Sequence, residues 1–132
     1  MKNNSPILIF VYNADSGFFN TLTDTAHKLL SPNTYSCNLC SISHGSFGMK
    51  KEWKEFLHSI KYSLEFLHRN ELSKKYNITK INLPAILIKE HNSIRILITA
   101  PYINSCKNIG DLKELINKEI IYLTQKIHSV FY

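Results

Sequence analysis

The chain has 132 residues, of which 44% are hydrophobic and 20% are charged, a balance that excludes a disordered chain and predicts one domain over residues 1–132. The formal charge is +6, but only two of the basic residues, Arg69 and Arg95, are arginines. Bidentate reading of bases favours arginine, so we expect no specific nucleic-acid complex.

The cysteine content and the amino end bear on the compartment. Three cysteines are too few for the dense disulfide framework of a small secreted domain. The apolar run from Ile7 to Val11 is too short for a signal peptide or a membrane span. We therefore expect a cytoplasmic protein without a transmembrane segment. Thiols are kept reduced there, and a Cys-x-x-Cys pair is more often catalytic or metal-binding than structural.

The first half of the chain predicts a strand followed by two helices. Residues 7–12 form a continuous apolar run that is typical of a strand buried on both faces. Residues 14–30 carry apolar side chains at helical spacing, and Pro32 ends that helix. After a segment with two cysteines, residues 48–60 repeat the helical pattern around Trp53, which we expect in the core.

The second half predicts a strand, a short helix, a hairpin and a long helix. The strand covers residues 62–68 and the short helix follows it. The hairpin joins strands at Ala85–Ile88 and Ile94–Thr99 through a loop built on Asn92 and Ser93. Residues 101–110 read as a loop, and the final helix runs over 111–128 with Asp111 and Glu114 as a capping box. This order predicts an α/β fold: a mixed sheet flanked by helices.

The element order and the segment "LPAILIKEHNSIRILI" resemble the thioredoxin superfamily. In that family a strand, a helix and a proline-led hairpin precede the last helix. The proline is typically cis and faces the active site. Pro84 occupies that place, so the resemblance implies a thioredoxin-like fold, a cis Leu83–Pro84 bond and a part for Pro84 in an active site.

The chain departs from the thioredoxin pattern after its first strand. Thioredoxins carry Cys-x-x-Cys where the central strand meets its helix, and the chain reads "ADSG" there. The pair "CNLC" then lies in an insertion at residues 31–60. A second alignment places that pair at the head of the helix near Lys50, after a strand drawn from "SPNTYS". That strand would be polar and contain proline, which favours the first alignment. The pattern "YNADSG…TYSCNLC…LPA" also looks like a group of short uncharacterised bacterial proteins, which implies no activity.

The cysteine pair allows three interpretations, of which the first is thiol–disulfide exchange. Cys37 and Cys40 can close a small disulfide ring if one thiol has a lowered pKa, which a helix N-terminus or a cation supplies. His44, Lys50 and Lys51 are candidate cations nearby. The partners would be protein thiols.

The second interpretation is a metal site, and the third is a structural pair. Cys37, Cys40 and His44 have the spacing C-x2-C-x3-H, and two thiolates with an imidazole suit zinc or reduced copper. A fourth ligand, Cys106 or His27, would have to come through the fold. In the third interpretation the cysteines are small buried residues of an interaction domain with a protein partner.

Overall fold

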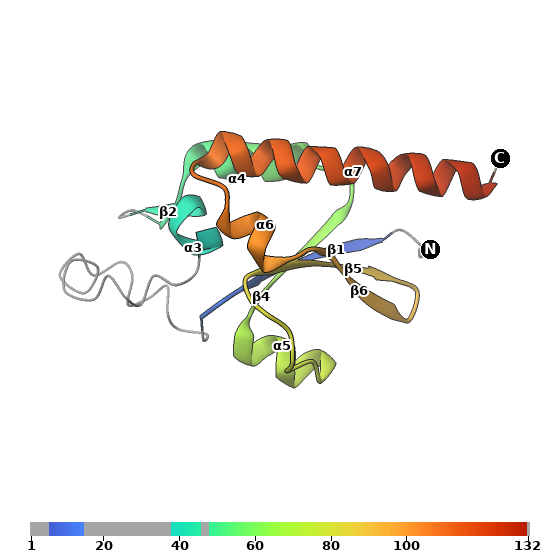
Figure 1. Ribbon diagram of the computed structural model, residues 1–132, viewed down its shortest axis with the longest axis horizontal. Helices are drawn as coiled ribbons and strands as arrows, with labels where there is room; N and C mark the ends of the chain where they lie inside the picture. The colour runs from blue at the N-terminus through green and yellow to red at the C-terminus, as the bar shows by residue number, and fades with distance from the viewer. Residues whose placement is uncertain (1–5, 15–37, 46–47, 132) are drawn as a thin grey trace.

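The structure, a computed structural model, describes residues 6–14, 38–45 and 48–131. Its centre is a four-stranded sheet with helices on both faces (Figure 1). The sheet consists of β1 (Ile7–Tyr12), β4 (Ser63–His68), β5 (Ala85–Glu90) and β6 (Ser93–Ile98) in the order β4-β1-β5-β6. The helices are α3 (Asn38–Ser43), α4 (Lys51–Ser59), α5 (Arg69–Tyr76), α6 (Ala100–Asn104) and α7 (Ile109–Phe131). The predicted α/β class with a mixed sheet is confirmed.

Strand β1 is one of the two interior strands of the sheet and pairs with β4 and β5. It runs parallel to β4, with Phe10 opposite Phe66, and antiparallel to β5, with Phe10 opposite Ile86. The continuous apolar run that predicted this strand follows from its position, because a strand covered on both faces buries every side chain. The sequence predicts that the strand at residues 7–12 lies next to the first strand of the hairpin, and the pairing of β1 with β5 confirms it.

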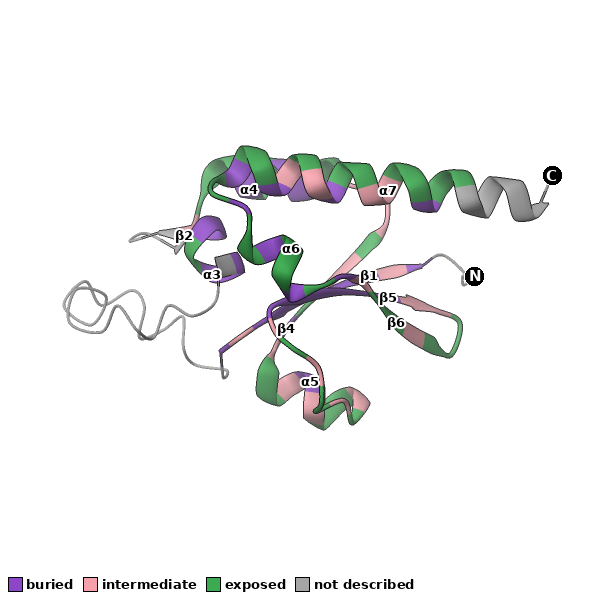
Figure 2. Cartoon of the chain, in the orientation of Figure 1, coloured by how far each residue is buried: buried purple, intermediate pink, exposed green. Residues whose placement is uncertain are grey.

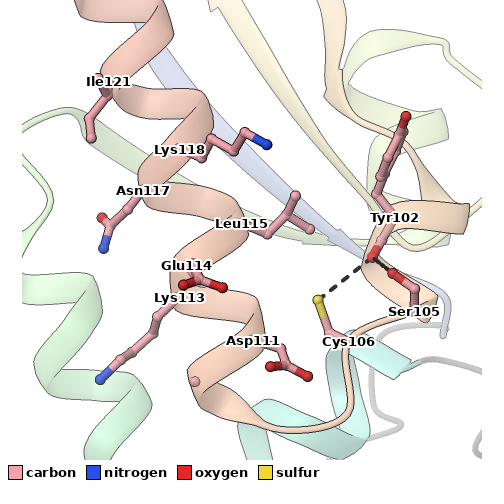
Figure 3. A pocket seen from close by; sticks show the side chains of 11 residues that line it. Tyr102, Ser105, Cys106, Asp111, Lys113, Glu114, Leu115, Asn117, Lys118 and Ile121 are labelled. Carbon is pink, nitrogen blue, oxygen red and sulfur yellow. Dashed lines mark hydrogen bonds between the residues drawn. The ribbon is translucent and has the colours of Figure 1, made fainter.

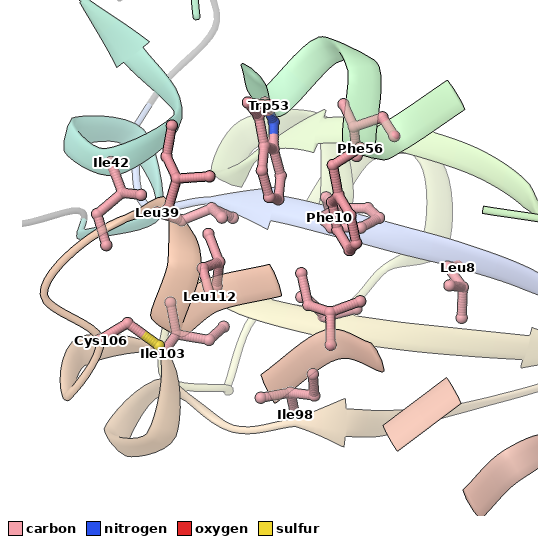
Figure 4. Close-up of a cluster of buried hydrophobic side chains, with 14 of the residues drawn as sticks. Leu8, Phe10, Leu39, Ile42, Trp53, Phe56, Ile98, Ile103, Cys106 and Leu112 are labelled. Atoms are coloured by element: carbon pink, nitrogen blue, oxygen red, sulfur yellow. The ribbon is translucent and has the colours of Figure 1, made fainter. Parts of the chain in front are cut away.

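The larger of two hydrophobic clusters lies between the sheet and helices α4 and α7 (Figures 2 and 4). Leu8, Phe10 and Tyr12 point from β1 into this cluster, since alternate residues of a strand share a face. Trp53, which is fully buried, comes from α4, and its ring meets Phe10 edge-on at 6.0 Å. The predicted core position of Trp53 is confirmed.

The smaller cluster lies on the opposite face of the sheet, under α5. It contains Ile9 and Val11 of β1, Leu87 of β5 and Leu72 of α5. Helix α5 begins at Arg69, directly after β4, and ends at Tyr76, where Asn77 in the left-handed conformation caps it. The predicted short helix is confirmed.

The hairpin of β5 and β6 agrees with its prediction except at the turn. His91, with φ of 59°, makes the turn, and Ser93 is the first residue of β6 rather than part of the loop. Pro84 is buried at the head of β5, and the Leu83–Pro84 bond is cis, as the resemblance implied.

Two expectations after the hairpin are wrong. The predicted loop 101–110 contains the short helix α6, because Pro101 fits a first turn and Ile103 gains a fully buried position. Helix α7 starts two residues early, because Asn108 is its cap. The side-chain oxygen of Asn108 accepts the Asp111 N–H at 2.8 Å, and Asp111 itself accepts the Lys107 N–H at 3.0 Å.

The cysteine segment is described only in part. Residues 38–45 and 48–60 of the predicted insertion form α3, a small hairpin of β2 (His44–Gly45) and β3 (Gly48–Met49), and α4. Most of the predicted helix at residues 14–30 and the segment "SPNTYS" lie outside the described residues. Among the described residues, no helix has the length and apolar character needed to cross a bilayer.

Candidate functional site

A polar cluster gathers where the parallel strands β1 and β4 end. Tyr12 and His68 are register partners at the last position of these strands, and their rings lie 5.8 Å apart. The ring of His44, from β2, meets Tyr12 edge-on at 5.7 Å. The carboxyl ends of parallel strands are where open α/β sheets commonly bind ligands, so this edge is the best placed part of the described chain for a site.

Ser43 sets the protonation pattern of His44. The Ser43 side chain is fully buried, and its oxygen lies 2.6 Å from the Leu39 carbonyl and 2.7 Å from His44 Nδ1. The hydroxyl has one proton, which it donates to the carbonyl, and its oxygen then accepts the Nδ1–H of His44. In the neutral ring this tautomer leaves Nε2 as the nitrogen with the lone pair.

Burial keeps two members of the cluster uncharged at neutral pH. It lowers the pKa of His44 from 6.5 to about 4, and the nearby charges of His68 and Lys50 act in the same direction. Burial also raises the pKa of Tyr12 well above its usual range, against a smaller opposing effect of the Ser43 hydroxyl. His44 and Tyr12 therefore offer hydrogen-bonding atoms and no net charge.

Glu71 of α5 supplies a carboxylate at the same edge, next to His68. The backbone N–H of His68 donates to Glu71 Oε1 at 2.7 Å, and His68 Nδ1 lies 2.7 Å from the same oxygen. These hydrogen bonds hold the pKa of Glu71 below its usual value and cap the first turn of α5. The Arg69 N–H donates to the Ala14 carbonyl at 2.9 Å, which ties the end of β1 to the start of α5.

Cys40 lies in α3 beside this edge and is disulfide-bonded. Its side chain is 1% exposed and belongs to the larger cluster, together with Tyr12 and Leu39. Cys106 is a free thiol at the end of α6, and burial together with the charge of Asp111 raises its pKa. Cys37 lies outside the described residues.

Of the predicted metal ligands, Cys40 and His44 lie among the described residues, in α3 and β2. Among the described residues, no group of three or more histidine, cysteine, aspartate or glutamate side chains is placed to hold a metal ion. A disulfide sulfur is not the thiolate that zinc or copper binds, so the oxidised Cys40 does not serve as a ligand. His27 and Cys37 lie outside the described residues, and a site of Cys37, Cys40 and His44 stays a prediction for the reduced protein.

Pro84 lies at the same end of the sheet as the polar cluster. It directly precedes Ala85, which is the register partner of Val11, so it stands one residue beyond that pair and beside the end of β1. No sequence motif identified Tyr12, Ser43 and His68 as site residues. Their one signal is that Tyr12 and His68 each end a predicted strand.

No protein family model, no curated protein and no solved structure matches this chain.

Proposed function

We propose that the chain is a thioredoxin-like domain that exchanges thiols and disulfides through Cys37 and Cys40. The sheet supports the alignment in which residues 7–12 are the central strand, because β1 lies between β4 and the proline-led β5. The hairpin then precedes the long last helix, in the order that the resemblance requires.

The observation that carries the proposal is the state of the cysteines. The chain has three cysteines; Cys40 is disulfide-bonded and Cys106 is a free thiol. We propose Cys37 as the partner of Cys40, which would make the bond a Cys-x-x-Cys disulfide. Bonds of this spacing are typical of thiol–disulfide oxidoreductases.

The burial of Cys40 assigns the two sulfurs their roles. A thiol that is 1% exposed does not meet a protein disulfide first, so Cys37 is the attacking thiolate. It bonds to one substrate sulfur and releases the other as a thiolate. The Cys40 thiolate then attacks Cys37, forms the internal disulfide and releases the second substrate sulfur. One substrate disulfide is reduced to two thiols, and one dithiol of the chain is oxidised.

The polar cluster has a part in the second step. A buried thiol is a weak nucleophile until a base removes its proton. His44 is neutral at physiological pH, and the hydrogen bond to Ser43 leaves its Nε2 as the basic nitrogen. Because its pKa is lowered to about 4, His44 is a weak base, so we assign it a positioning role through its hydrogen bond to Ser43, and solvent takes the thiol proton.

The proposal is tested by the reduction of insulin disulfides with dithiothreitol as the electron donor. The wild-type protein should accelerate the reaction, and Cys37→Ser and Cys40→Ser should each remove at least about 90% of that acceleration. Cys106→Ser is the matched control and should retain it. Equal rates with and without the wild-type protein would contradict the proposal and leave the disulfide a structural bond.

Metal binding is the second candidate, for the reduced protein. It is favoured by the neutral state of His44, since a metal ligand must be an unprotonated imidazole. Elemental analysis of protein reduced and purified without chelator should then show about one equivalent of zinc or copper. His44→Ala should lose it, and an equal metal content in wild type and variant would exclude this site.

The cytoplasmic location stays a prediction.

A further inference from the structure

A groove lies along the solvent-facing side of α7, beside α6. Its volume is about 860 Å³. Tyr102 and Cys106 line it on one side and Leu115 of α7 faces them, whereas Ile121 lines it from the side of α7 farther from Tyr102 (Figure 3). Gly110 lies at the end where α7 begins, so that end of the groove has no side chain from this position.

The groove collects apolar side chains that the fold leaves in solvent. Among the described residues, five large hydrophobic side chains are exposed. Tyr102 is 64% exposed and Ile121 is 58% exposed, and both line the groove. Tyr122, next to Ile121, is 60% exposed. Aromatic and aliphatic side chains gathered along one groove are typical of the centre of a protein interface.

The charges on α7 indicate what covers this surface. Glu114 and Lys118 are both exposed, line the groove and lie one helical turn apart. In an antiparallel pair of α7 helices that is centred on residue 116, Glu114 of each copy lies opposite the partner's Lys118. A two-fold axis repeats every contact, so the same pairing forms twice. A pair centred on Lys118 would instead place two lysines against each other.

The same arrangement places the exposed Ile121 at the open end of the partner's groove. In this antiparallel pair, a residue five positions after residue 116 faces the residue five positions before it in the partner. Ile121 therefore lies opposite the partner's Asp111, next to the partner's Gly110. Helix α7 has 23 residues, or about 34 Å of length, which is enough for an extended helix–helix contact.

We propose that this groove is the interface of a symmetric homodimer in which two α7 helices pack antiparallel, with Ile121 of each copy in the groove of the other. The net charge of +6 on each copy opposes association at low salt, whereas the opposite charges of Glu114 and Lys118 fix the register locally. The dimer should therefore form at physiological ionic strength, where long-range repulsion is screened. The inference does not depend on the chemistry of the cysteines.

Sedimentation equilibrium at physiological salt, over a micromolar concentration range, tests the proposal. The wild-type protein should be a dimer. Glu114→Lys and Lys118→Glu should each weaken dimerisation at least about tenfold, because each places like charges in contact. The double variant, Glu114→Lys with Lys118→Glu, restores both pairs across the two-fold axis and should dimerise like the wild type.

Two further variants separate the interface from general effects of charge and folding. Ile121→Glu should give a monomer with an unchanged circular dichroism spectrum, since the residue is exposed in the single chain. Lys54→Glu makes the same charge change as Lys118→Glu on an exposed position of α4 and should leave the dimer intact. A monomeric wild-type protein over the whole range, or a double variant no tighter than the single ones, would overturn the proposal.

Discussion

The two faces of the sheet differ in what happens at the end of β1. On the face toward α4 and α7, the row Leu8, Phe10 and Tyr12 starts apolar and ends in a buried phenol that contacts two histidine rings. On the face toward α5, the row of Ile9 and Val11 stays apolar to its end. One face of β1 is thus purely apolar, and the other face ends in Tyr12, a residue of the candidate site.

The face toward α4 and α7 can bury Tyr12 and Ser43 because the hydrophobic cluster on it is the larger one. Trp53, Phe56 and Leu112 cover β1 from two helices, so Tyr12 and Ser43 are removed from water at the margin of a large apolar cluster (Figure 4). Burial is what shifts the pKa values of Tyr12 and His44. The smaller face, covered by one short helix, provides less of this burial, and its polar groups stay in contact with solvent (Figure 2).

The largest effect is expected from Trp53→Ala. The indole is fully buried and contacts Phe10 and Phe56, with ring centroids 6.0 Å and 5.6 Å away. Its removal leaves a cavity in the larger face and should lower the free energy of unfolding by about 3–5 kcal/mol in urea titrations. Trp53→Phe should cost clearly less. If the alanine variant lost less than about 1 kcal/mol of unfolding free energy, the packing of α4 would not be essential to the larger cluster.

The next effect concerns His44 and the pH dependence of stability. Its pKa is lowered from 6.5 to about 4 in the folded protein, so the unfolded chain binds the proton more tightly. Stability from this group is fully present above pH 6.5 and should be lost as the pH falls toward about 4, by up to about 3 kcal/mol.

The measurement compares unfolding free energies between these pH values for the wild type and His44→Asn. The variant should lose less stability on acidification. His58→Asn, at an exposed histidine of α4, serves as the control and should keep the wild-type slope. Equal slopes for all three proteins would show that His44 is not buried as described.

The smallest effect is expected on the other face, from Tyr76→Phe. The Tyr76 hydroxyl donates to Glu65 Oε1 at 2.7 Å, next to the ion pair of Glu65 with Lys75. Both residues are partly in solvent, so the loss of this hydrogen bond should cost about 1 kcal/mol in thermal or urea unfolding. A cost as large as that of Trp53→Ala would contradict the proposed difference between the faces.

The elements with a strong local pattern could be predicted from the sequence, and the site could not. The strand at residues 7–12, the helix around Trp53 and the hairpin after Pro84 each follow from periodicity or turn residues. Helix α6 was missed because its five residues gain their stability from the burial of Ile103, which is a tertiary effect. The start of α7 was misplaced because Asn108 and Asp111 both suit a cap and only the folded backbone selects one.

The polar cluster escapes prediction because it joins segments far apart in the chain. Tyr12 and His68 are 56 positions apart and become neighbours only through the register of β1 and β4. A sequence shows which residues end strands but not which strands pair. The cysteine pair, by contrast, is visible in the sequence as a local motif.

The central claim is that Cys37 and Cys40 form one reversible redox couple, and a redox titration tests it most directly. The protein is equilibrated in glutathione buffers of different potential, alkylated, and its modified cysteines are identified by mass spectrometry. Cys37 and Cys40 should lose their thiols together in one two-electron transition at a potential above about −300 mV, with Cys106 alkylated throughout. A pair that stays oxidised below about −300 mV, or cysteines that titrate independently, would contradict the account.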